Sequence, residues 1–279
     1  MDPAIRLADG VKIRFAEAGH DRSETAILTS PWPESLFAFR KVWDRLSARF
    51  HVIAIDLPGF GMSERQLDLL SPQAMGAFLI ELVREWNLGP VHFVAPDVGT
   101  SAALWAASND PELVRSLAIG GGGMAVPLQV GGSLKEIIEA PDMDAYRQID
   151  SREILGPVYD AMPGGAPPPE VRRDYLESYA GDRFVESARY VRTYPTELPK
   201  LAEKLPGIET PVQIVCGSDD PLVPTSNQEF LHARLPHSKM HLLPAGHFAW
   251  EEVPDLYGEI LIDWMASGYR DSMTTSMKR

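Results

Sequence analysis

Short apolar segments alternate with amphipathic segments along most of this chain, and this alternation limits the fold more than any other feature. Apolar runs with the period of a β-strand are separated by segments with the period of an α-helix. Strands that are joined through helices lie parallel in one sheet. The pattern therefore predicts an α/β protein with a mostly parallel, doubly wound sheet. We expect strands at 11–18, 25–30, 51–56, 91–95, 113–120, 211–217 and 238–245, and helices at 37–50, 72–87, 100–109 and after Pro254.

The alternation stops at a glycine-rich segment, residues 120–132. From there to about Tyr194 the chain is helix-like and rich in tyrosine, and a loop of prolines and glycines at 163–170 interrupts it. The strand pattern resumes only near residue 211. We therefore expect a helical cap, residues 124–194, inserted between the two parts of one sheet domain, residues 1–123 and 195–279.

A sharp turn at the end of the strand 91–95 carries one reactive side chain. The segment Ala95-Pro96-Asp97-Val98-Gly99 joins this strand to the next helix. A strand, a turn flanked by small residues and a helix form a nucleophile elbow, which projects one side chain above the sheet. Asp97 stands at the tip and can act as a nucleophile, although an aspartate here could also serve only as the N-cap of the helix.

Two later loops contain the partners that a nucleophile needs. Asp219 and Asp220 lie in GSDDPLVP, directly after the strand 211–217, and His247 lies in PAGHFAWEEVP, after the last strand. Nucleophile, acid and histidine thus follow one another in an order that is known for catalytic triads. A single histidine in a loop is usually a surface residue, but the combination predicts a catalytic set.

These motifs together resemble those of the α/β-hydrolases. The resemblance rests on DLPGFGMSE (56–64), PWPES (31–35), the elbow, GSDDPLVP and AGHF, and it extends from about Val11 to Met265. It implies the α/β-hydrolase fold with an inserted cap. An aspartate at the elbow resembles the branch that contains epoxide hydrolases and haloalkane dehalogenases.

The resemblance implies a role for each residue of the set. Asp97 is then the nucleophile, His247 the base, and Asp220, which directly precedes a proline, the acid that orients the base. A carboxylate suits displacement at an sp³ carbon and forms an ester, which water activated by the histidine can hydrolyse. The backbone N–H groups of Trp32 and Val98 are expected to form the oxyanion hole.

The chain departs from the family on the loop that follows the strand 25–30. Ser30 and Pro31 replace the usual His-Gly, and the fixed φ of Pro31 leaves open how well Trp32 can present its N–H group. The indole of Trp32 could equally be ordinary packing. This altered loop is the one feature that favours a different class of function, a ligand-binding module with an inactive site.

Two kinds of substrate remain open. The oxygen of an epoxide needs a hydrogen-bond donor as the ring opens, and the resemblance implies a pair of cap tyrosines, for which Tyr146 and Tyr190 are expected, with Tyr194 as a substitute. Each of these could instead be a packing residue. Dehalogenation of a haloalkane or haloacid is the alternative, but Val98 stands where those enzymes usually have tryptophan. We therefore expect hydrolysis of an epoxide to a diol, and no esterase or C–C hydrolase, because no serine occupies the elbow tip.

The charge and residue composition limit the possible partners. The chain contains 26 Lys and Arg against 39 Asp and Glu, and its net charge of −13 disfavours nucleic acids and anionic membranes. Cys216 is the lone cysteine, and neither a signal peptide nor an apolar run of about 18 residues is evident. We expect a cytoplasmic monomer or homodimer that acts on a small molecule without a cofactor. The seven histidines show no metal-ligand spacing, so we expect no metal either.

Overall fold

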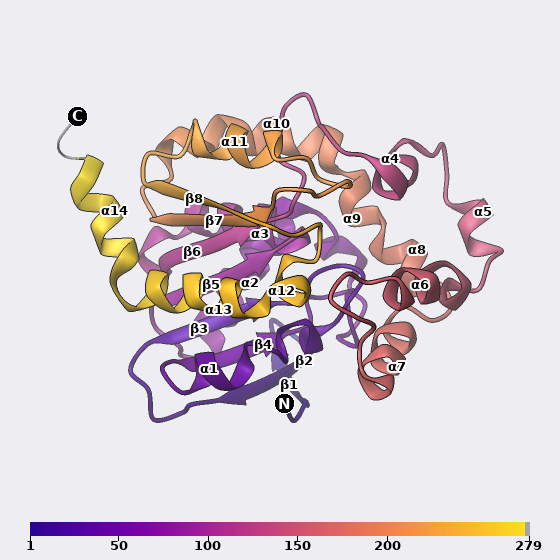
Figure 1. Ribbon diagram of the computed structural model, residues 1–279, viewed down its shortest axis with the longest axis horizontal. Coiled ribbons are helices and arrows are strands. Elements are labelled where there is room, and N and C mark those ends of the chain that lie inside the picture. Colours follow the sequence, from indigo (N-terminus) through magenta and orange to yellow (C-terminus); the bar gives the residue numbers. More distant parts are fainter. Residues whose placement is uncertain (277–279) are drawn as a thin grey trace.

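One sheet of eight strands organises the molecule, which the computed structural model describes over residues 1–276 (Figure 1). The strand order is β1-β2-β4-β3-β5-β6-β7-β8. β2 pairs antiparallel with β1 and β4, and the other neighbours are parallel. The expected α/β class with a mostly parallel sheet is confirmed. The strands are β1 (Ala4–Ala8), β2 (Val11–Ala18), β3 (Thr25–Thr29), β4 (His51–Ile55), β5 (Val91–Pro96), β6 (Val114–Gly120), β7 (Val212–Gly217) and β8 (Ser238–Leu243).

Helices cover both faces of this sheet, with α13 in front of it and α2 and α3 behind it in Figure 1. The α-helices are α1 (Trp43–Ser47), α2 (Pro72–Glu85), α3 (Val98–Asn109), α4 (Gly132–Glu139), α5 (Asp144–Arg147), α6 (Ser151–Asp160), α7 (Pro169–Ser178), α8 (Arg183–Ser187), α9 (Arg189–Arg192), α10 (Tyr194–Lys204), α11 (Ser226–His232), α12 (Ala249–Glu252), α13 (Pro254–Asp263) and α14 (Tyr269–Ser276). The 3₁₀-helices are η1 (Leu36–Phe39), η2 (Leu67–Leu69), η3 (Pro111–Leu113) and η4 (Leu205–Gly207), and η5 (Trp264–Gly268) is a short π-helix. Within residues 1–276, no helix is both long enough and apolar enough to cross a membrane.

The sequence pattern missed one strand of the sheet, and one expected helix is shorter than predicted. The sequence pattern missed β1, because this edge strand buries only Ala8 and leaves Ile5 and Leu7 each 58% exposed. The helix expected at 37–50 is instead the short turn η1 followed by α1. The turn is held by a tertiary contact, since the Leu36 N–H donates to the Asp56 carboxylate (2.7 Å), and such a contact is invisible in a local pattern.

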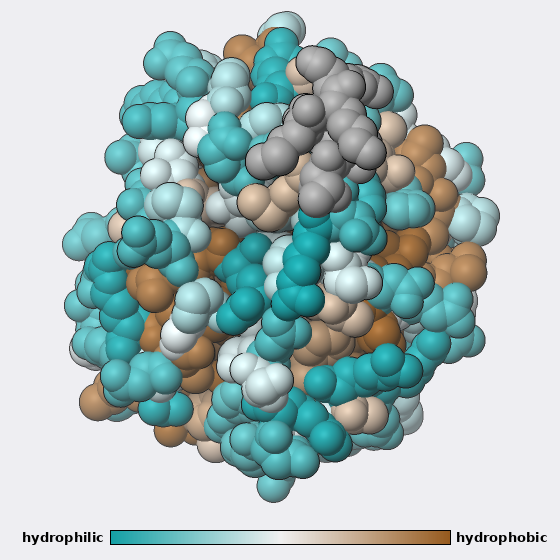
Figure 2. Space-filling model, turned by 90° about the vertical axis from the view of Figure 1, so that its left-hand side faces the viewer, coloured by the Kyte–Doolittle hydropathy of each residue, from teal (hydrophilic) through white to brown (hydrophobic). Residues whose placement is uncertain are grey.

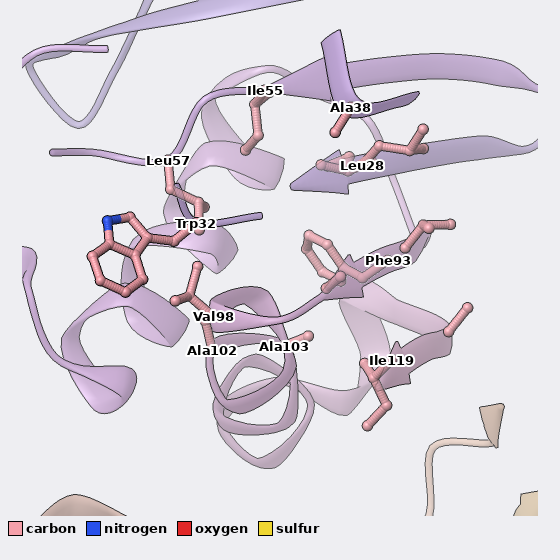
Figure 3. Close-up of a cluster of buried hydrophobic side chains, with 14 of the residues drawn as sticks. Leu28, Trp32, Ala38, Ile55, Leu57, Phe93, Val98, Ala102, Ala103 and Ile119 are labelled. Atoms are coloured by element: carbon pink, nitrogen blue, oxygen red, sulfur yellow. The ribbon is translucent and has the colours of Figure 1, made fainter. Parts of the chain in front are cut away.

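The central strands are buried on both faces. Every residue of β3, β5 and β7 is buried, as expected for parallel strands between two helical layers. Figure 3 shows side chains of the neighbouring strands β3, β4, β5 and β6 gathered beside the first turns of α3. The buried cluster drawn there includes Leu28, Ile55, Phe93, Val98, Ala102, Ala103 and Ile119. This core fixes the carboxyl ends of β5 and β7, where the expected site residues follow.

Between β6 and α10, the chain forms only helices and loops. Figure 1 shows α4 to α9 beyond the carboxyl ends of the strands, at the right of the view. The opposite side of the molecule, where the parallel strands begin, faces the viewer in Figure 2 and is mostly hydrophilic. The boundaries of the cap at 124 and 194 stay a prediction.

The helices α2 and α3 pack tightly against each other at Gly76. A Cβ atom there would lie 2.4 Å from Trp105 Cβ and 2.8 Å from the Ala102 carbonyl oxygen. Alanine normally stabilises a helix by about 1 kcal/mol relative to glycine, but overpacking costs about 1–3 kcal/mol. We expect Gly76→Ala to lower the free energy of unfolding by about 1 kcal/mol, measured by urea denaturation. Gly207→Ala is the control, because nothing lies within 4 Å of its added Cβ. An unchanged midpoint for Gly76→Ala would contradict the tight packing.

Candidate active site

Asp97 stands at the turn between β5 and α3 in a strained backbone conformation. Its φ of 53° and ψ of −123° lie in a region that residues other than glycine rarely adopt. The turn is held from below, where the Asp97 N–H donates to the Gly120 carbonyl of β6 (2.8 Å). Gly99 allows the start of α3 to approach β3, since a Cβ atom there would lie 2.3 Å from Thr29 Oγ1. The surroundings thus force the Asp97 side chain upward, away from the sheet.

The two carboxylate oxygens of Asp97 have different surroundings. Oδ2 accepts a hydrogen bond from the Trp32 backbone N–H (2.6 Å), whereas Oδ1 lies 3.7 Å from His247 Nε2. Burial raises the pKa of Asp97 above its usual value, and the charge of His247 and the N–H groups of Trp32 and Val98 oppose this rise. Oδ2 is therefore held by the backbone N–H of Trp32, and Oδ1 faces the imidazole.

His247 is oriented from its far side by Asp220. His247 Nδ1 donates to Asp220 Oδ2 (2.8 Å), and Asp220 Oδ1 accepts from the N–H groups of Leu222 and Val223 (2.8 and 2.9 Å). Burial lowers the pKa of His247, but the hydrogen bond to Asp220 and the negative charges of Asp220 and Asp97 outweigh it, so the pKa lies above its usual value. The ring is thus fixed with Nε2 toward the carboxylate of Asp97.

The structure brings Asp97, Asp220 and His247 together. Asp219, which the sequence offered beside Asp220, is not part of this group. Asp219 is exposed and accepts a hydrogen bond from the Ser218 hydroxyl (3.1 Å) instead. Three groups in this order can perform nucleophilic attack followed by base-assisted hydrolysis.

The altered loop still presents its backbone donor. Ser30 is fully buried and its N–H donates to the Ile55 carbonyl (2.9 Å), which ties the loop to β4. The indole of Trp32 donates through Nε1 to Ser187 Oγ (2.9 Å) and stacks on Phe184, with ring centroids 5.5 Å apart. Trp32 therefore joins the loop to α8, and its N–H is bound to Asp97 although a proline precedes it.

The three expected tyrosines are not together. Tyr146 lines the cavity above Asp97, but Tyr190 and Tyr194 do not. The Tyr190 hydroxyl donates to the Val98 carbonyl (3.0 Å), and the ring of Tyr194 packs against that of Tyr190 at 5.9 Å. Both rings are buried beside the first turn of α3 and serve as packing there. The expectation that Tyr190 or Tyr194 faces the substrate is therefore corrected.

A cavity of about 280 Å³ lies above Asp97 and His247. Its walls come from the loops of the sheet domain and from helices α4, α5, α6 and α8, and they are mostly apolar. Such a lining suits a small apolar ligand that a few polar groups orient. The lining side chains are Trp32, Pro33, Asp97, Ser133, Leu134, Glu136, Ile137, Tyr146, Ile154, Leu155, Val158, Phe184, Leu222, His247 and Phe248.

A buried pair of acids beneath the site was missed in the sequence. Glu34 accepts a hydrogen bond from Trp250 Nε1 (2.7 Å), and Glu251 binds Arg40 Nη2 (2.8 Å) and Lys41 Nζ (3.1 Å). Burial raises the pKa of Glu34 well above its usual value, and the charge of Glu251 adds to the rise. Glutamates are rarely buried, so only the place of Glu34 in the motif PWPES could have indicated its importance.

Comparison with known proteins shows similarity over nearly the whole chain. A family model described as alpha/beta hydrolase fold matches residues 31–254. The uncharacterized hydrolase YugF of Bacillus subtilis is 25% identical over 92% of this chain and 95% of its own length. A 2-hydroxy-6-oxononadienedioate/2-hydroxy-6-oxononatrienedioate hydrolase of Escherichia coli is 23% identical over 92% of this chain and 91% of its own. The structure of Epoxide Hydrolase A from Mycobacterium thermoresistibile superposes with a TM-score of 0.77 at 20% identity, covering 95% of this chain and 99% of that one.

The raised pKa of Glu34 makes stability depend on pH. Glu34 holds its proton more tightly when folded than when unfolded, so its contribution to stability is complete below the usual glutamate pKa and is lost as the pH rises through the folded pKa. The variant Glu34→Gln cannot ionise and should lack this loss. We expect the Tm of Glu34→Gln minus the Tm of the unmodified protein to become larger as the pH rises from 4 to 8, measured by thermal denaturation. A constant difference across this range would show that Glu34 ionises normally.

Proposed function

This chain belongs to the alpha/beta hydrolase fold family, and we propose that it is a hydrolase that opens an epoxide to a diol through a covalent ester on Asp97. The observation that carries the proposal is the carboxylate at the elbow tip, with one oxygen bound to a backbone N–H and the other facing His247. A hydroxyl at this position would suit attack on a carbonyl. A carboxylate suits attack on an sp³ carbon with a strained leaving group.

In the first step, Asp97 Oδ1 forms a bond to one ring carbon of the epoxide. The bond from that carbon to the ring oxygen breaks, and its electron pair stays on the oxygen, which accepts a proton. The Tyr146 hydroxyl is suited to donate it, since Tyr146 supplies the phenol among the described residues that line the cavity. The product is a hydroxyalkyl ester of Asp97.

In the second step, His247 Nε2 removes a proton from water, and the water oxygen bonds to Cγ of Asp97. Negative charge then develops on Oδ2, which already accepts the Trp32 N–H at 2.6 Å. Removal of such a donor typically slows the reaction about 10²–10³-fold. When the tetrahedral intermediate collapses, the alkoxide takes the proton from His247 and leaves as the diol. The Asp97 carboxyl then gives up the second proton of the water, which returns through solvent to Tyr146, so that the Asp97 carboxylate and the Tyr146 phenol are both restored.

The local chemistry favours this reaction over those of other family members. Ser101, the serine nearest to the elbow in the chain, lies in α3 and is within 3.1 Å of the Tyr190 hydroxyl rather than in the cavity. A departing halide would need N–H donors beside it, but Val98 has none in its side chain and the Trp32 indole is already bound to Ser187. The apolar walls favour a small, largely apolar epoxide as the substrate.

The ester intermediate can be trapped by removing the base. We expect His247→Ala to gain the mass of one whole epoxide molecule when it is incubated with a panel of small apolar epoxides, measured by intact-protein mass spectrometry. Asp97→Asn is the matched control, because it keeps the shape of the side chain and loses the nucleophilic oxygen. It should gain no mass.

Each other result would overturn the proposal in a different way. A gain of only an alkyl group from a haloalkane, with halide released and no epoxide adduct, would establish a dehalogenase. An equal gain in Asp97→Asn would place the reaction on another residue. No adduct with any epoxide, together with no turnover by the unmodified protein, would favour a binding module with an inactive site.

The assignment of Tyr146 predicts a separate effect on ester formation. General acid catalysis contributes about 10²–10⁴-fold to rate. We expect Tyr146→Phe to slow single-turnover alkylation by an epoxide at least about 10²-fold, with hydrolysis of the preformed ester unchanged. Tyr194→Phe removes a hydroxyl outside the cavity and should alkylate at the rate of the unmodified protein. Equal rates for both variants would exclude Tyr146 as the donor.

A further inference from the structure

Three potential metal ligands meet at the side of the molecule where the parallel strands begin. They are Glu17 near the end of β2, His20 in the turn that follows it, and His51 at the first position of β4. One ligand atom from each lies within 4.8 Å of the other two. Glu17 Oε1 is 2.6 Å from His51 Nε2 and 3.4 Å from His20 Nδ1.

Strand pairing explains why these side chains meet. Ala18 of β2 lies opposite Val52 of β4, so Glu17 and His51 are close diagonal neighbours on one face of the sheet. On the other side, Thr25 of β3 lies directly beside His51 in the parallel register. Thr25 Oγ1 is 3.1 Å from His51 Nδ1, which fixes the ring and leaves Nε2 toward Glu17. Metal-binding histidines are usually held by such a bond to the second ring nitrogen.

The donor set fits a transition metal better than an alkaline-earth ion. Two imidazole nitrogens and one carboxylate oxygen are ligands of Zn²⁺, whereas Ca²⁺ and Mg²⁺ prefer oxygen atoms alone. Ligand atoms on a tetrahedral Zn²⁺ ion lie roughly 3.3 Å apart, since each is about 2.0–2.1 Å from the metal. The 3.4 Å separation of Glu17 and His20 already matches this value. The shorter contact between Glu17 and His51 is a hydrogen bond that the metal would replace.

We propose that Glu17, His20 and His51 form a binding site for a divalent transition-metal ion, and that this ion is Zn²⁺. The site is open to solvent, because the side chain of His20 is 70% exposed, and water can supply the fourth ligand. It lies at the amino end of β4, whereas Asp97 follows the carboxyl end of β5, so the metal takes no part in the hydrolysis. Its effect is to tie the turn after β2 to the strands and to stabilise the folded chain.

A second His–Glu pair provides a matched comparison. His237 Nε2 lies 3.0 Å from Glu209 Oε2, and the described residues offer no third ligand there. If an ordinary ion pair were sufficient to bind the metal, both pairs would bind it equally. The proposal requires the third ligand, His20, to make the difference.

The test is a Zn²⁺ titration of the full, untagged chain in competition with a chromophoric chelator. We expect one tight site per chain and at least a tenfold loss of affinity in His20→Ala and in His51→Ala. Thr25→Val removes only the partner of His51 Nδ1, and such outer partners typically contribute about 10–100-fold to affinity. His237→Ala should bind as the unmodified protein does, and excess Mg²⁺ should not compete.

Thermal denaturation supplies a second readout that is independent of activity. Saturating Zn²⁺ should raise the Tm of the unmodified protein and of His237→Ala, because the ion binds the folded state, but not that of His20→Ala. Because His20 is exposed, its loss should leave the metal-free Tm unchanged. The proposal is overturned if no saturable site is found, or if His20→Ala binds Zn²⁺ as tightly as the unmodified chain.

Discussion

The burial of one carboxylate, that of Asp97, is the constraint on which the arrangement of the site depends. A buried negative charge is unfavourable unless it is paired and hydrogen-bonded. Here the compensation comes from the loop after β3 through the Trp32 N–H, from the start of α3 through Val98, and from His247. The strained turn, the crowding at Gly99 and the two-sided burial of the strands all hold these donors in place. The sheet therefore acts as the rigid support that keeps the charge in a position where it is reactive.

The two buried acids beneath the site, Glu34 and Glu251, differ in the partners that compensate their charge. Glu251 keeps two cationic partners, Arg40 and Lys41, whereas Glu34 has the indole N–H of Trp250 and a second oxygen without a partner. A proton on Glu34 removes one of the negative charges that would otherwise surround Asp97, since the two carboxyls repel each other. The raised pKa of Glu34 therefore affects the charge around the nucleophile Asp97, although Glu34 does not line the cavity.

Local patterns predicted what depends on local physics. Strand and helix periods located β2 to β8, and the sequence around Asp97 together with the loops of Asp220 and His247 indicated groups that the structure brings together. The patterns failed where the direction of a side chain is set by distant partners. Tyr190 turns toward the Val98 carbonyl, and Glu17 meets His51 through the pairing of β2 with β4. Neither contact can be predicted from the spacing of residues along the chain. For this reason the spacing of the histidines in the sequence did not indicate a metal site.

The cavity itself bears on which leaving group this carboxylate can displace. Its described lining offers one phenol, Tyr146, and otherwise mostly apolar walls, so departing charge receives little stabilisation beyond one hydrogen bond. A strained ring needs less assistance than an unstrained bond, because opening the ring releases strain as the charge develops. A single proton donor is also suited to an oxygen that ends as a hydroxyl, whereas a halide leaves as a free anion and needs several donors around it. The scarcity of donors, more than the similarity of the fold to any relative, therefore connects the Asp97 carboxylate with epoxides.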